Sequence, residues 1–165
     1  MNVSDLTSAA SHRTIALESV DSVSLSALTG ILTIDLDALV ANWRKLEGRS
    51  VPAECAGVVK ADAYGCGLPA VVTALAAAGC KTFFVATLNE ARAARAATKS
   101  AAIYVLDGCL VGTAEVFADI DARPVIGDLA ELAEWDAFCR RTGWAGGAAI
   151  HVDTGMNRLG LTMTE

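Results

Sequence analysis

The stretch that decides the fold is Val58-Val59-Lys60-Ala61-Asp62-Ala63-Tyr64-Gly65-Cys66-Gly67. An apolar run over residues 56–59 leads to Lys60 at the point where the strand pattern stops, and a glycine-containing turn and an apolar helical pattern follow. In parallel α/β proteins, ligands bind at the carboxyl ends of the strands. Partial desolvation favours the neutral form of a lysine amine, which is the form that acts as a nucleophile or base. The alternative is a lysine that caps the strand and points into water.

The composition argues against several classes of protein. The chain has 165 residues, 53% of them hydrophobic, and a net charge of −6. The negative charge and the lack of a Lys/Arg cluster argue against a nucleic-acid surface, and no apolar run is long enough to span a bilayer. Five scattered cysteines without a CxxC pair predict reduced thiols in a cytoplasmic protein, and two histidines without ligand spacing argue against a zinc site.

The spacing of the expected strands predicts an α/β fold with about five βα units and parallel strands. Strand ends are expected near Lys60, Thr87, Leu106, Ile126 and Val152, which are 19 to 27 residues apart. Five units are part of a (β/α)8 barrel, which needs eight units and roughly 250 residues. An open, doubly wound sheet of five strands fits the same spacing.

The remaining pattern places the other elements. Residues 1–30, rich in Ser and Thr, are expected to form a flexible N-terminal extension. A short strand is expected at Ile31–Asp35, with Asp35 or Asp37 capping the helix that follows. A later helix is expected to begin at Asp128, with Glu131 completing a capping box, and to end at Gly143.

Two motifs resemble the signatures of the alanine racemase family. VVKADAYGCG (58–67) resembles the family's cofactor-lysine motif, and VDTGMNRLG (152–160) resembles its second signature. The runs FFVATLNEA, IYVLDG and PVIGD lie between them in the family's order. The resemblance covers about residues 31–165, and it implies that this segment is the N-terminal portion of a racemase-type (β/α)8 TIM barrel.

The resemblance implies a cofactor, pyridoxal 5'-phosphate, and three site residues. Lys60 would be the Schiff-base lysine and the base that handles the α-proton of the D-isomer. Tyr64 would contact the cofactor phosphate, and Arg158 would bind the cofactor's phenolic oxygen and lie near the substrate carboxylate. Taken without the family, Tyr64 reads as an aromatic plug in a loop and Arg158 as half of a surface ion pair.

The implied activity is that of an isomerase, alanine racemase, which interconverts L-alanine and D-alanine and supplies D-alanine for peptidoglycan. The family implies a cytoplasmic homodimer at full length that acts on a small amino acid. No nucleic-acid or membrane partner is expected.

Two residues depart from the family pattern. Cys66 stands where the family usually has histidine. It is a smaller and weaker hydrogen-bonding group, so it would either orient Tyr64 less well or, as the favoured alternative, be a tolerated replacement near the site. His151 stands where many members carry a carbamylated lysine that orients the arginine. A histidine cannot supply that negative charge, so Asp153, a bound anion or a carbonyl would steer Arg158 instead, and His151 itself could be a plain strand residue.

The length is the third departure, because family chains are more than twice as long. The chain is therefore expected to be an incomplete N-terminal part, and the base on the opposite face of the substrate, a tyrosine from a C-terminal β-domain in the family, has no counterpart here. The alternatives are a non-catalytic remnant, a pyridoxal-phosphate-binding module, a single-domain carrier of that cofactor or another amino-acid racemase. The pairing of KADAYG with VDTGMNRLG favours alanine racemase.

Overall fold

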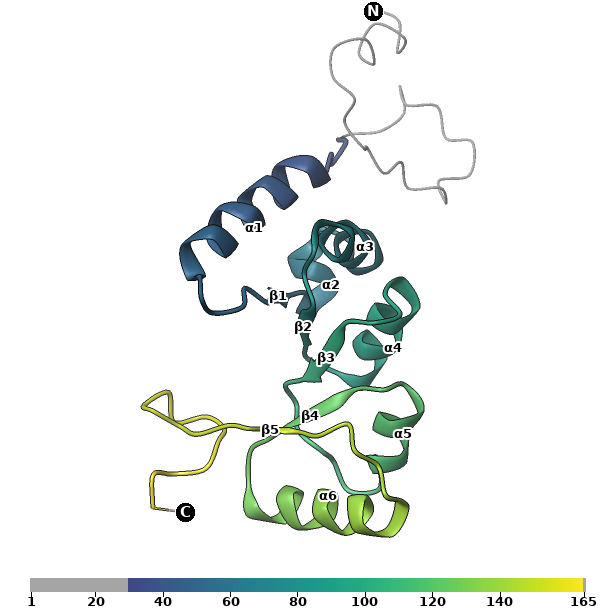
Figure 1. The fold of residues 1–165 in the computed structure, drawn as a ribbon, viewed down its shortest axis with the longest axis vertical. Coiled ribbons are helices and arrows are strands. Elements are labelled where there is room, and N and C mark those ends of the chain that lie inside the picture. The colour runs from purple at the N-terminus through teal and green to yellow at the C-terminus, as the bar shows by residue number, and fades with distance from the viewer. Residues whose placement is uncertain (1–29, 165) are drawn as a thin grey trace, which may run out of the picture.

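Five parallel strands form one sheet in the computed structural model, which describes residues 30–164 (Figure 1). The strands are β1 (Gly57–Val58), β2 (Thr82–Val85), β3 (Ala102–Val105), β4 (Arg123–Ile126) and β5 (Ala149–Ile150). Every strand pairs with the next one along the chain, in the order β1-β2-β3-β4-β5. A doubly wound sheet reverses its strand order at a switch point. The α/β class with parallel strands is therefore confirmed, and the order is that of a barrel wall.

One helix precedes the first strand and the others follow the strands (Figure 1). They are α1 (Leu36–Ser50), α3 (Leu68–Ala78), α4 (Leu88–Ala97), α5 (Ala114–Asp119) and α6 (Leu129–Thr142), and α2 (Lys60–Gly65) is a short turn that belongs to the candidate site. α3, α4 and α5 lie side by side along the sheet (Figure 1). α3 contacts both α1 and α4, and α5 contacts α6. Except for Gly30, the expected N-terminal extension lies outside the described residues.

The helix ends follow the local chemistry of the sequence. The Asp35 carboxylate accepts a hydrogen bond from the Ala38 N–H at 2.9 Å, so α1 begins where the sequence predicted. α3 and α6 end at Gly79 and Gly143, which have φ values of +114° and +71°. These are left-handed conformations that glycine adopts without a steric penalty.

Two local predictions are wrong. The segment Ile31–Asp35 forms no strand in the described structure, where only Asp35 of these five residues takes part in a single β-bridge. The capping box at α6 forms only in half. The Asp128 carboxylate accepts from the Glu131 N–H at 2.8 Å, but the Glu131 carboxylate turns to the Gly127 N–H instead of that of Asp128.

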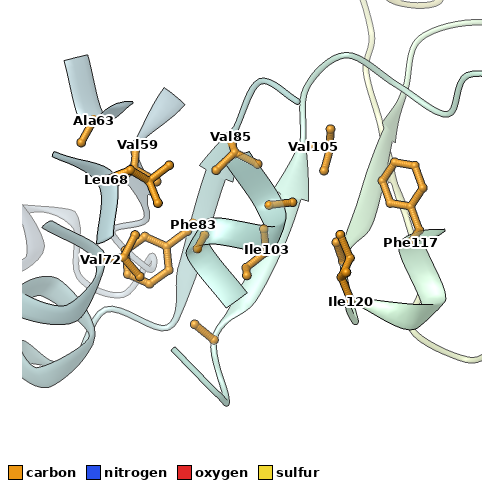
Figure 2. Packing of buried hydrophobic residues seen from close by; sticks show 14 of the residues in the cluster. Val59, Ala63, Leu68, Val72, Phe83, Val85, Ile103, Val105, Phe117 and Ile120 are labelled. Atoms are coloured by element: carbon orange, nitrogen blue, oxygen red, sulfur yellow. The ribbon is translucent and has the colours of Figure 1, made fainter. Parts of the chain in front are cut away.

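The core lies between the helices and one face of the sheet (Figure 2). Phe83 and Val85 of β2 and Ile103 and Val105 of β3 alternate with half-buried residues, which is the period-2 pattern of a strand. All four are almost completely buried. Val72 of α3 lies beside Phe83 and supplies apolar area from the helical layer (Figure 2).

The opposite face of the sheet carries an aromatic pair. Phe84 and Tyr104 are partners in the register of β2 and β3, and their rings stack with centroids 5.2 Å apart. The Arg123 guanidinium lies 5.6 Å from the Tyr104 ring centroid, a cation–π distance. In a (β/α)8 barrel, the face of the sheet away from the helices is the barrel interior.

We predict that Phe83→Ala lowers the free energy of unfolding by about 3–5 kcal/mol, because it removes a fully buried ring from the core. Denaturant unfolding measures the change. Val111→Ala, at a side chain that is 90% exposed, is the control and should change stability by less than about 0.5 kcal/mol. Equal losses in the two variants would contradict the described core.

Candidate functional site

Lys60 lies directly after the last hydrogen bond between β1 and β2. The Val59 N–H donates to the Phe84 carbonyl oxygen at 2.9 Å, and the chain then leaves the sheet at its carboxyl edge. The Lys60 side chain is half-buried, and within residues 30–164 its Nζ makes no hydrogen bond and no ion pair. A lysine amine is thus held at the edge where parallel α/β proteins bind ligands, with no internal partner that uses it.

The four residues after Lys60 form a left-handed turn. Ala61, Asp62, Ala63 and Tyr64 all have φ between 52° and 55° and ψ between 38° and 51°. Each L-residue in this conformation costs roughly 1–2 kcal/mol relative to the right-handed helix. The sequence predicted a turn here, but it did not predict one of this hand, built mostly without glycine.

Local hydrogen bonds hold the turn in place. The Ala63 N–H donates to the Val59 carbonyl oxygen at 2.8 Å, and the Gly67 N–H donates to the Asp62 carbonyl oxygen at 2.9 Å. The Asp62 carboxylate accepts from the Leu68 N–H at 2.6 Å and so joins the turn to the start of α3. Strained backbone of this kind persists only where the surroundings fix it, and it clusters at functional sites.

Tyr64 ends the turn and faces solvent. Its side chain is 65% exposed, and its hydroxyl makes no hydrogen bond within the described part of the chain. Cys66 is half-buried, and its thiol likewise bonds to none of the residues from 30 to 164. The cysteine thiol therefore makes no hydrogen bond to the tyrosine hydroxyl.

Arg158 lies on a closed loop after β5. The Asp153 N–H donates to the Leu161 carbonyl oxygen at 2.9 Å, and the Leu161 N–H donates to the His151 carbonyl oxygen at 2.8 Å, so residues 153–160 form a loop with adjacent ends. The Arg158 side chain is exposed and forms no ion pair with the described residues.

Asp153 organises this loop through its backbone. Its carboxylate accepts hydrogen bonds from the N–H groups of Gly155 and Met156, both at 2.9 Å, and of Asn157 at 3.0 Å. These bonds lower the pKa of the Asp153 carboxyl from its ordinary value, with the Gly155 N–H as the largest cause. Asp153 thus steers the chain that carries Arg158 and does not pair with the guanidinium itself.

His151 is packed as a strand residue. Its N–H donates to the Ile126 carbonyl oxygen at 2.8 Å, which extends the pairing of β4 and β5. A Cβ at Gly160 would lie 3.0 Å from His151 Cδ2 and 2.8 Å from the Asp153 nitrogen, and Gly160 has a φ of +106°. Only glycine fits there, so the closed loop and the half-buried histidine depend on Gly160.

The structure brings Lys60 and Tyr64 together on the turn after β1, whereas Arg158 follows β5, the strand at the opposite edge of the sheet. β1 and β5 are the two edge strands, with three strands between them. In the described residues no hydrogen bond or ion pair joins Arg158 to Lys60 or Tyr64. They also contain no cluster of three or more metal-ligating side chains. None of the helices from 30 to 164 is long and apolar enough to cross a membrane.

Sequence reasoning missed two carboxylates near Lys60, those of Asp62 and Glu90. Glu90 accepts a hydrogen bond from the Ala61 N–H at 2.7 Å. The pattern Thr87-x-x-Glu90 indicates a capping box, so the sequence could have identified Glu90 as a helix-capping residue. It does not indicate the hydrogen bond from Ala61, which follows the neighbouring strand β1.

The fold and the two motifs together define an α/β-barrel protein with a lysine at a strand end. The model of the family "Alanine racemase, N-terminal domain" matches residues 34–165, and the chain belongs to this family. The expected family is therefore confirmed.

Relatives and solved structures agree with this assignment. The alanine racemase of Methylobacterium nodulans is 55% identical over 134 residues, which are 81% of this chain and 36% of the relative. That of Acidiphilium cryptum is 49% identical over 139 residues, or 81% and 37% of the two chains. The alanine racemase structure from Bartonella henselae, which has covalently bound pyridoxal phosphate, matches with a TM-score of 0.76 and 38% identity over 80% of this chain and 39% of that one. The chain thus spans a little over a third of these proteins.

We predict that the Arg158 loop opens in acid. Because the Asp153 pKa is lowered in the fold, its contribution to loop stability is fully present above the ordinary carboxyl value of 3.8 and is lost as the pH falls through the lowered value. Hydrogen exchange of the Gly155, Met156 and Asn157 amides measures the opening, when the rate at each pH is divided by the intrinsic rate of an unprotected amide at that pH. Asp153→Ala should show the open loop already at neutral pH, and unchanged protection in that variant would contradict the account.

Proposed function

We propose that this chain carries the cofactor lysine of an alanine racemase, an isomerase that interconverts L-alanine and D-alanine with pyridoxal 5'-phosphate. The observation that carries the proposal is the half-buried Lys60 amine without an internal partner, held by a strained turn at the carboxyl end of β1. Residues 31–165 would be the N-terminal portion of the racemase-type barrel domain, and residues 1–30 an extension that precedes it.

The donor set fits pyridoxal phosphate in its chemistry. A primary amine, Lys60, suits its aldehyde. A phenolic hydroxyl, Tyr64, can donate to its phosphate, and a guanidinium, Arg158, suits its phenolic oxygen. None of these three groups is used by an internal hydrogen bond among residues 30–164. When bound, the cofactor supplies an electron sink for the charge that develops at the substrate α-carbon.

Lys60 would have two roles. Its Nζ would hold the cofactor covalently through the aldehyde, and the amino group of the substrate would take the place of the lysine there. The freed amine would exchange the proton on one face of the substrate α-carbon: it would remove the α-proton of D-alanine, or add one there when D-alanine forms. Racemisation also needs a second group that exchanges the proton on the opposite face.

Arg158 and Tyr64 would bind and orient. The guanidinium is charged at every working pH and presents a planar set of donors, which suits the phenolic oxygen and the substrate carboxylate. Its loop is already ordered by Asp153 and Gly160, so binding would need little rearrangement of the backbone. Tyr64 Oη, exposed at the end of the left-handed turn, is available to the phosphate.

The wider role follows from the relatives that bear the name alanine racemase. Since the chain spans about 36% of the first of these, the activity, the homodimer, the cytoplasmic setting and the supply of D-alanine for peptidoglycan are proposed for the whole protein to which this segment corresponds.

Borohydride trapping of pyridoxal phosphate on the full chain tests the proposal. We predict that peptide mapping finds the cofactor on Lys60 in preference to Lys99, an exposed lysine that serves as the reference within the same molecule. Added alanine should lower the ratio of labelled Lys60 to labelled Lys99, because the substrate amine displaces the lysine only where the site accepts it.

Each outcome has a definite meaning. Equal labelling of the two lysines would contradict a cofactor site at Lys60. Selective labelling that alanine does not change would favour the alternative of a cofactor-binding module without racemase chemistry.

A further inference from the structure

The Glu90 carboxylate joins the ends of two neighbouring strands. One oxygen, Oε1, accepts a hydrogen bond from the Ala61 N–H at 2.7 Å, and the other, Oε2, accepts from the Ala86 N–H at 2.8 Å. Ala61 is the residue directly after Lys60, and Ala86 is the residue directly after β2. One side chain thus fixes both chain segments where they leave the sheet.

The geometry gives Glu90 a role beyond capping its own helix. The bond that closes the capping box, from the Thr87 N–H to Oε2, is long at 3.4 Å. The shortest bond of the carboxylate is the one to Ala61, 29 positions earlier in the sequence. Hydrogen bonds to an ionised carboxylate are about twice as strong as neutral ones, so the side chain is directed mainly at the strand ends.

The peptide that Glu90 binds is the first one of the left-handed turn. Ala61 has a φ of 52° and is exposed, so no apolar packing holds it in this conformation. Its N–H follows the Lys60 carbonyl in the same peptide group. A change in the orientation of that peptide therefore changes the direction in which the Lys60 Cα–Cβ bond points.

The same device recurs two strands further on. Glu131 stands at the third position of α6, as Glu90 does in α4, and its carboxylate accepts from the Gly127 N–H after β4 at 2.7 Å. It also lies so close to Gly108, after β3, that a side chain at position 108 would collide with it. This second carboxylate lies away from Lys60 and provides a matched control.

We infer that Glu90 is a positioning residue for Lys60: its carboxylate holds the Lys60–Ala61 peptide in the orientation that presents the amine for covalent capture of pyridoxal phosphate. The inference rests on the proposed function of Lys60 and adds a residue outside the two motifs. Glu90 does not touch the amine, and it acts through the backbone of Ala61.

Glu90→Gln tests the inference in the full chain, with Glu131→Gln as the matched control. Glutamine retains one accepting oxygen and replaces the other with an NH₂ group, which cannot accept from a peptide N–H. We expect Glu90→Gln to lower the ratio of trapped cofactor on Lys60 to that on Lys99 severalfold and Glu131→Gln to leave it unchanged. Thermal unfolding of both variants reports the purely structural cost.

A second measurement, amide hydrogen exchange at Ala61, can be made on the wild-type chain. The exposed Ala61 amide of the wild-type chain should exchange with solvent about tenfold more slowly than an unbonded amide, because a hydrogen bond to a charged acceptor protects it. Thr87→Ala, which removes the hydroxyl that caps α4 and retains the carboxylate, should keep both this protection and the labelling ratio.

The outcomes separate the inference from the function on which it rests. Lack of selective labelling at Lys60 in the wild-type chain would overturn the proposed function. Selective labelling in the wild type that persists in Glu90→Gln, or an unprotected Ala61 amide, would overturn the positioning role alone. An equal drop in the ratio for Glu90→Gln and Glu131→Gln would also overturn it, since it would reduce Glu90 to a general structural residue.

Discussion

The left-handed turn of Ala61–Tyr64 is the constraint on which the candidate site depends. Four consecutive L-residues with φ near 54° are unfavourable on their own, and the fold keeps them there with bonds from several directions. The Val59 carbonyl oxygen accepts from inside the turn, Asp62 binds the start of α3, and Glu90 binds the first peptide of the turn from the neighbouring unit. The turn sets both the direction of Lys60 and the position of Tyr64, so the site is built largely by backbone geometry.

Carboxylates at the carboxyl edge of the sheet accept hydrogen bonds from the backbone where the strands end. Parallel strands end with peptide N–H groups that no following strand takes up, and acidic side chains at helix starts accept from them. Glu90 and Glu131 do so between strands, and Asp153 does so within the Arg158 loop. These carboxylates keep the strand ends ordered, while the cationic groups Lys60 and Arg158 stay free of internal ion pairs among residues 30–164.

Much of the fold could be predicted from the sequence because it depends on local periodicity and on caps. The alternation in TFFV and AIYV, Asp35 at the start of α1 and glycine at the ends of α3 and α6 all gave correct elements. The strand expected at 31–35 does not form, and a single β-bridge at Asp35 is the pairing that the described segment shows. Apolar alternation alone does not specify a pairing strand, which local sequence cannot reveal.

The site was predicted less completely. Lys60, Tyr64 and Arg158 are proposed from the motifs. The hand of the turn could not be predicted, since Ala, Asp and Tyr have no intrinsic preference for it that would overcome its steric cost. The reach of Glu90 to Ala61 depends on which strands are neighbours, and only the sheet order reveals that. Asp153 was one of three groups expected to steer Arg158, and its carboxylate binds the backbone of the loop that carries the arginine.

The left-handed turn can be tested most directly by comparing Ala→Gly substitutions at two exposed positions, Ala61 in the turn and Ala137 in the middle of α6. Glycine relieves the steric cost of a positive φ, so Ala61→Gly should leave the free energy of unfolding unchanged or raise it by up to about 1 kcal/mol. Ala137→Gly, in a right-handed helix, should lower it by about 0.5–1 kcal/mol. A loss at Ala61 as large as that at Ala137 would contradict the left-handed turn and the account of how Lys60 is positioned.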